Sequence, residues 1–69
     1  MNITILRETQ GYRATQSARG VRITAKAARV YPKSRVVSLR VWKQLAGMSD
    51  QSFDGSVVLE LGIGAFNGR

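Results

Sequence analysis

The sequence contains no cysteine and no histidine among its 69 residues. Without cysteine, the chain has no disulfide bonds, no thiol nucleophile and no thiolate ligand for zinc. Without histidine, it lacks the side chain that most often moves protons in catalysis near neutral pH. These two absences exclude disulfide-stabilised folds, cysteine and histidine zinc sites, and imidazole-based mechanisms.

Long apolar segments are also missing. The C-terminal run Val57-Val58-Leu59 is interrupted by Glu60, and a spanning helix needs roughly 20 apolar residues. The first ten residues show neither the basic start nor the apolar core of a signal peptide. We therefore expect no membrane association and a cytoplasmic location.

Acidic residues are scarce, with four Asp and Glu against eleven Lys and Arg, and the net charge is +7. Ten of the basic residues lie in residues 1–43, where Glu8 is the single acid, so this part carries +9. Residues 44–69 carry −2. The basic residues are spread out rather than clustered, and 43% of the chain is apolar. This pattern predicts a charged face of a folded domain rather than a disordered basic arm.

Alternation of apolar and polar residues predicts short strands. Turn residues separate them at 8–11, at 18–20 and at Tyr31–Ser34, where proline fixes the backbone. The second strand is half polar, which favours a place at the edge of the sheet. The expected strands are 3–5, 12–17, 21–28, 36–39 and 57–63, the last with the clearest alternation.

Residues 39–47 are compatible with a strand, in which Leu39 and Val41 would share a face, or with a short helix, and we favour the helix. Val41, Trp42 and Leu45 form an apolar stripe, and Gly47 predicts a left-handed stop after a helix over residues 40–46. A polar loop is expected over residues 49–55. The fold class is therefore a single basic, mainly β domain over residues 1–69, with four to five short strands and one short helix.

Residues 22–48 carry an ordered set of motifs. Arg22-Ile23-Thr24 is followed by Ala28, Tyr31-Pro32, Ser34-Arg35, an aliphatic strand, Trp42, and then Ala46-Gly47-Met48. This order resembles the SymE-like proteins, small bacterial toxin-type proteins of the AbrB/MazE swapped-hairpin superfamily. Their layout is a strand, a Tyr-Pro turn, an aliphatic strand, a short helix with Trp, and a final strand pair. Arg40, Lys43 and Met48 depart from the residues usual in that family, and residues 1–20 have no counterpart.

The resemblance implies an intertwined homodimer that presents a basic surface to DNA or RNA, with a toxin-like or regulatory role. A small SH3- or OB-like barrel is the alternative fold. A nucleic-acid partner also follows from the charge itself, because proteins that cover phosphates need several cations on one surface. Such a protein would be nucleoid- or RNA-associated, and its size suits a mobile-element or prophage product.

The candidate site residues follow from this interpretation. Tyr12 and Tyr31 lie beside cations and are candidates for stacking on bases. Leu39, Trp42 and Leu45 are candidates for the core or the dimer interface. The expected nucleic-acid-binding residues are Arg13, Arg19, Arg22, Lys26, Arg29, Lys33, Arg35, Arg40 and Lys43.

Two other functions are compatible with the sequence. A basic phage-type protein can bind and modulate an acidic host protein, and a member of a toxin family can act as a ribonuclease. The four carboxylates show no paired spacing, and serine and threonine have no base partner. We therefore expect no catalytic residues, no metal and no cofactor, and we lean against an enzyme.

Overall fold

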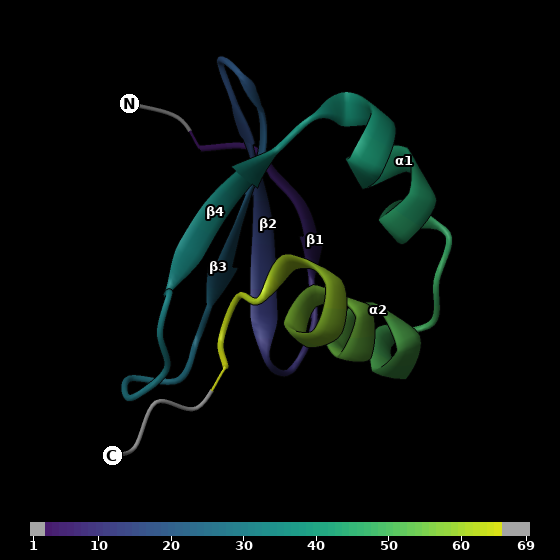
Figure 1. Cartoon of the computed structure of the whole chain (residues 1–69). Helices are drawn as coiled ribbons and strands as arrows, with labels where there is room; N and C mark the ends of the chain where they lie inside the picture. Colours follow the sequence, from purple (N-terminus) through teal and green to yellow (C-terminus); the bar gives the residue numbers. More distant parts are fainter. Residues whose placement is uncertain (1–2, 66–69) are drawn as a thin grey trace.

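The computed structural model describes residues 3–65, which form a sheet layer and a helical layer (Figure 1). The sheet contains β1 (Ile5–Glu8), β2 (Tyr12–Ser17), β3 (Gly20–Ala25) and β4 (Ser34–Val37). The helical layer contains α1 (Leu39–Ala46), α2 (Asp50–Ser56) and a π-helical turn, η1 (Val57–Leu61). The prediction of a small, mainly β single domain is confirmed.

The sheet is an open antiparallel meander in the order β1-β2-β3-β4. A tight turn joins β2 to β3, with Ser17 opposite Gly20. Gly20 has φ 145°, and a Cβ there would collide with the carbonyl oxygen of Val37, so the position requires glycine. Because β2 lies between β1 and β3, the predicted edge position of residues 12–17 is wrong. Its half-polar pattern arises because one face of the sheet is uncovered.

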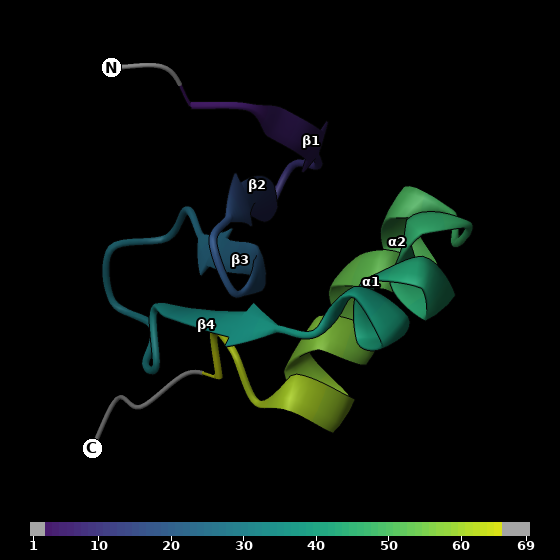
Figure 2. The ribbon, with the colours of Figure 1, turned by 90° about the horizontal axis from the view of Figure 1, so that it is seen from above.

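All the helices lie on one face of the sheet (Figure 2). Alternate strand residues point into this layer, and Phe53 is 1% exposed and meets Trp42 edge-on with ring centroids 6.1 Å apart. Burial of these apolar surfaces is the main force that joins the two layers. The buried core consists of Tyr12, Ala14, Val21, Ile23, Ala25, Val37, Leu45, Phe53, Val57 and Ile63.

Helix α1 confirms the predicted helix over residues 40–46 and begins one residue earlier. The Ser38 side chain accepts a hydrogen bond from the Val41 amide and caps its first turn. The predicted left-handed stop is wrong, because Gly47 has φ −89°. The last carbonyls of α1 are bound instead by a side chain from β1, described below.

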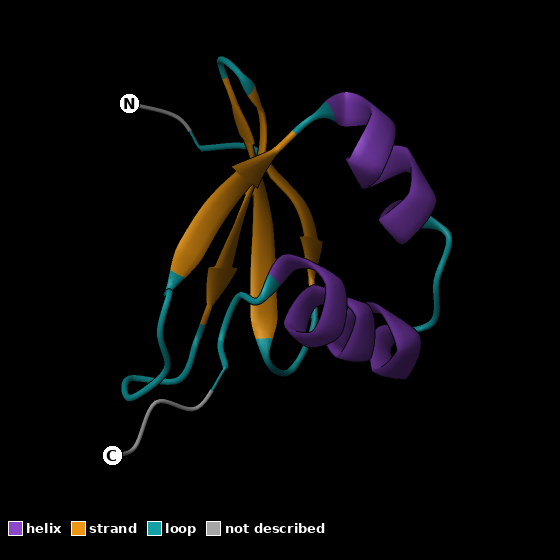
Figure 3. Cartoon of the chain, viewed as in Figure 1, coloured by secondary structure: helices purple, strands orange, loops and turns teal. Residues whose placement is uncertain are grey.

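The C-terminal part differs from the prediction of a loop at 49–55 and a strand at 57–63, since residues 50–61 are helical (Figure 3). The Ser49 side chain caps α2 by accepting from the Ser52 amide. Phe53, Val57 and Leu61 then recur every four residues and face the core. The alternation seen in the sequence is misleading, because Leu59 is 85% exposed. The helical spacing therefore overrides the strand pattern.

Arg7 joins the edge strand β1 to the helical layer. The register of β1 against β2 shifts between Ile5 and Arg7, so that Ile5 opposes Thr15 whereas Arg7 opposes Ala14. This bulge turns Arg7 towards the helices and Ile5 towards the uncovered face.

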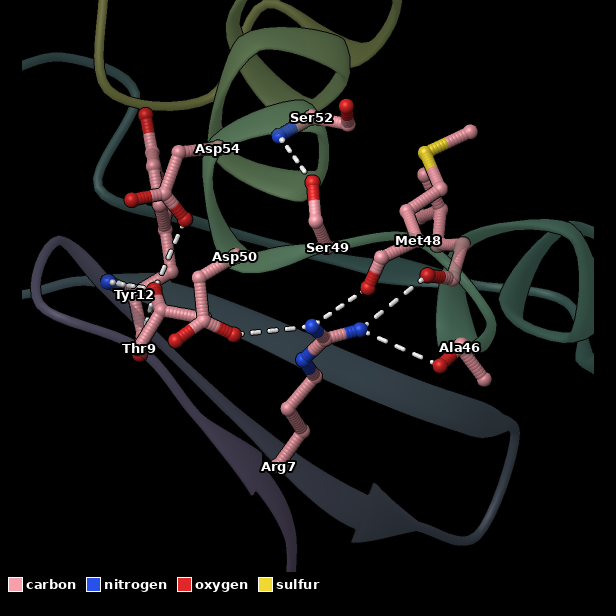
Figure 4. Close-up of polar contacts among 10 residues, drawn as sticks. Arg7, Thr9, Tyr12, Ala46, Met48, Ser49, Asp50, Ser52 and Asp54 are labelled. Atoms are coloured by element: carbon pink, nitrogen blue, oxygen red, sulfur yellow. Dashed lines mark hydrogen bonds and ion pairs between the residues drawn. The ribbon is translucent and has the colours of Figure 1, made fainter.

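The Arg7 guanidinium binds the end of α1 and the start of α2 (Figure 4). It donates to the Asp50 carboxylate at 2.8 Å and lies 4.7 Å from the centre of the Phe53 ring. It also donates to three carbonyl oxygens, those of Leu45 at 3.3 Å, Ala46 at 3.1 Å and Met48 at 2.6 Å. The Ala46 carbonyl at the end of α1 thereby gains a partner, and the Leu45 carbonyl, which also accepts from the Met48 amide at 3.0 Å, gains another.

Tyr12 makes a second connection between the layers. Its buried hydroxyl donates to the Ile63 carbonyl at 2.8 Å, and a Cβ at Gly64, which has φ 80°, would collide with its phenol oxygen. Burial raises the pKa of Tyr12 above its usual value of 10.0, and the charge of Asp54 adds to the shift. The folded protein therefore favours the neutral phenol.

We expect Arg7→Lys to destabilise the protein by about 2 kcal/mol, because an ammonium group cannot reproduce the planar fork that reaches several acceptors. Unfolding in urea measures the change. Arg13→Lys, a matched substitution at an exposed position, should stay within about 0.5 kcal/mol of the wild type. Equal losses in the two variants would contradict the role assigned to Arg7.

Tyr12 also predicts a dependence of stability on pH. Because the folded pKa lies above the unfolded value, the stabilisation is complete below about pH 10 and is lost as the pH rises above it. Tyr12→Phe should be less stable at neutral pH by about 1 kcal/mol, and its stability should fall less at alkaline pH. Thermal unfolding between neutral and alkaline pH measures both effects, with Tyr31→Phe, which removes an exposed phenol, as the control. Identical alkaline profiles for wild type and Tyr12→Phe would refute the assignment.

Candidate nucleic-acid interface

The uncovered face of the sheet is hollowed into a groove of about 740 Å³. Among residues 3–65, four basic residues, two threonines and three aliphatic residues line this surface, which we call the basic groove. The lining residues are Ile3, Ile5, Arg13, Thr15, Arg22, Thr24, Ala25, Lys26 and Lys33. They come from three strands and from the segments that flank them.

Strand register explains why these side chains gather. Arg13 opposes Thr24, and Thr15 opposes Arg22, so all four project from the same face of β2 and β3. The residues between them, such as Ala14 and Ile23, face the helices and are buried. The basic groove is therefore the polar half of the alternation whose apolar half forms the core.

One acid, Glu8, lies at the groove. Its Oε2 atom is 3.1 Å from Arg13 Nη2 and 2.7 Å from Lys26 Nζ. Lys26 Nζ also donates to the Thr9 carbonyl at 2.7 Å. Hydrogen bonds from Lys26 and then Arg13 hold the pKa of Glu8 below its usual value, so its carboxylate is ionised at neutral pH.

The other two groove cations have no such neighbour. Arg22 donates to the Ser34 hydroxyl at 3.3 Å. Within residues 3–65, no carboxylate forms an ion pair with Arg22 or Lys33. Their charge is available to an external anion.

The remaining acids lie away from the groove. Asp50 binds Arg7, and Asp54 accepts from the Thr9 hydroxyl at 2.7 Å, both on the helical side (Figure 4). Glu60 is exposed on η1. In the described part of the chain, no group of three acidic side chains is placed to hold a metal ion.

The nine expected nucleic-acid-binding residues do not all lie on one surface. Arg13, Arg22, Lys26 and Lys33 share the groove. Arg35 opposes Ile23 and therefore lies on the other face of the sheet, although its neighbour Ser34 lies on the groove side. The other four lie outside the groove lining, at the β2–β3 turn (Arg19), in the β3–β4 connection (Arg29) and on α1 (Arg40 and Lys43).

The two tyrosines differ in accessibility. Tyr12 is 6% exposed, so its predicted role in stacking on bases is wrong, because its ring belongs to the core. Tyr31 is 68% exposed and remains accessible, but it does not line the groove.

The three residues expected in the core or the dimer interface differ in burial. Leu45 is 3% exposed and Trp42 is half-buried against the core, which makes both residues part of this domain's own interior. Leu39 is 58% exposed at the start of α1, so only Leu39 of the three presents an exposed side chain.

The sequence interpretation missed several groove residues. Thr15 and Thr24 supply hydroxyl groups, and Ile3 and Ile5 supply an aliphatic wall. Period-two alternation could have identified the threonines, because they share a strand face with Arg13 and Arg22. The position of Ile5 depends on the bulge in β1, and no local sequence pattern predicts this bulge.

Comparison of this chain with known proteins identifies no relative. The sequence matches no model of a known protein family, and neither the curated proteins nor the solved structures include a significant match. Within residues 3–65, no helix combines the length and apolar content needed to cross a lipid bilayer.

Proposed function

We propose that this chain binds nucleic acid, DNA or RNA, through the basic groove on the uncovered face of its sheet. The observation that carries the proposal is the convergence of four cations and two threonine hydroxyls on one hollowed surface. Three of the four acids among residues 3–65 lie elsewhere. The surface is therefore strongly positive where it is concave.

Phosphate groups match this lining chemically. A guanidinium donates two parallel hydrogen bonds to phosphate oxygens, and an ammonium group binds them as a point charge. Threonine hydroxyls donate to phosphate or sugar oxygens. Each neutralised phosphate releases counterions, so binding should weaken steeply as the salt concentration rises.

The groove lining favours contact with the sugar-phosphate backbone over base reading. Among residues 3–65, this lining contains no aromatic side chain, whereas stacking platforms for single strands are built from exposed rings. The part of the lining that the structure describes also has no Asn or Gln, the usual partners of adenine edges. We therefore propose binding with little dependence on sequence.

The resemblance to SymE-like proteins supports the same partner class. The strand, Tyr-Pro turn, strand and Trp-bearing helix occur in the expected order as β3, residues 31–32, β4 and α1. The helical residues 50–61 depart from the family layout, which ends in a strand pair. A toxin-like or regulatory role, a homodimer, and a cytoplasmic, nucleoid- or RNA-associated location remain part of the proposal.

The test compares two double variants that remove equal charge. Arg22→Ala/Lys33→Ala removes the two groove cations without carboxylate partners, and Arg40→Ala/Lys43→Ala removes two exposed cations of α1. Binding to duplex DNA and to single-stranded RNA is measured across a salt series by fluorescence anisotropy. On duplex DNA, the groove variant should lower the log–log salt slope by about 0.9 for each lost contact. The α1 variant should bind as the wild type does.

Thermal unfolding of both variants checks that their folds are intact. Equal loss of affinity in the two variants would mean that net charge, rather than the groove, controls binding. If the folded wild type binds neither nucleic acid at low salt, the proposal is wrong and an acidic protein becomes the preferred partner.

A further inference from the structure

Glu8 places a negative charge on the surface that the proposed function requires to be positive. Its carboxylate pairs with two of the four groove cations, Arg13 and Lys26, through the same oxygen atom. The other three acids among the described residues do not contact a groove cation. Glu8 is therefore the one acid of residues 3–65 whose position bears directly on an anionic ligand.

The geometry around Glu8 Oε2 is that of an anion-binding position. A guanidinium nitrogen and an ammonium nitrogen converge on one oxygen, at 3.1 Å and 2.7 Å. Lys26 is held there by a second bond, to the Thr9 carbonyl, so the position is built by the backbone of the β1–β2 turn as well as by side chains. A phosphate oxygen accepts the same charged hydrogen bonds as a carboxylate oxygen.

These ion pairs are exposed, and exposed pairs are weak. The side chains of Glu8, Arg13 and Lys26 are 40%, 49% and 34% exposed. Pairs of this kind contribute little to stability because water and salt screen them and because holding two flexible side chains costs entropy. Replacing the carboxylate should therefore leave the fold intact while it changes the charge that a ligand meets.

We infer, on the basis of the proposed function, that Glu8 competes with phosphate for the groove. Its carboxylate occupies the anion position between Arg13 and Lys26. The groove then divides into an open end, at Arg22 and Lys33, and an occupied end at Glu8. In the wild type, Glu8 limits the number of phosphates that the groove neutralises and so keeps both the affinity and its dependence on salt moderate.

Glu8→Gln tests this inference, with Glu60→Gln as the matched control. Both substitutions remove one negative charge, but Glu60 lies exposed on η1, away from the groove. The probe is a labelled DNA duplex of mixed sequence, titrated across a salt series. Glu8→Gln should bind more tightly at low salt, and its log–log salt slope should steepen by about 0.9 for each freed cation. Between 50 and 200 mM salt, this is about a threefold greater loss of affinity for each new contact.

A third variant tests whether the effect of Glu8→Gln on the salt slope depends on Arg13 and Lys26. In Glu8→Gln/Arg13→Gln/Lys26→Gln, the steeper slope should disappear, because the cations that Glu8 releases are no longer present. Equal slopes and affinities for Glu8→Gln and Glu60→Gln would overturn the inference while leaving groove binding intact. Failure of the wild type and Glu8→Gln alike to bind the duplex would overturn the inference together with DNA binding at the groove. Thermal unfolding confirms that each variant is folded.

Discussion

The contact between Arg7 and the helical layer organises this small protein. A single guanidinium on an edge strand binds three carbonyls around the end of α1, the Asp50 carboxylate at the start of α2, and the face of the Phe53 ring. It thereby holds both helices against the same face of the sheet. A domain of this length buries little surface, so a multidentate contact of this kind adds to the apolar burial that joins the layers and fixes where both helices sit.

Strand β1 contributes both to the contact between the two layers and to the candidate site. Arg7 faces the helices, and Glu8, the next residue, faces the basic groove, as strand geometry requires. The bulge between Ile5 and Arg7 sets this arrangement, because it places Ile5 and Glu8 on the uncovered face while Arg7 turns inward. Both of the roles assigned to β1 therefore depend on one local irregularity.

Most of the N-terminal fold was predictable because period-two alternation and turn residues act locally. The β2–β3 turn, the Tyr-Pro bend and helix α1 were placed from the sequence, and so was the position of Arg22 and Lys26 on one surface. The site residues were predictable only as a group of cations. Arg35 was grouped with Arg22, yet pairing of β4 with β3 sets Arg35 opposite buried Ile23 and directs it to the other face.

The sequence by itself determined a small folded domain with a basic N-terminal part, antiparallel strands and chemistry without cysteine or histidine. Charge count, alternation and absent residue types are properties of the chain that no packing can change. Only the tertiary structure decided that residues 50–61 are helical, because Phe53, Val57 and Leu61 gain more from facing the core together than from alternating in a strand. It also decided that Tyr12 is buried and that four of the cations share a groove, because both depend on which face of the sheet the helices cover.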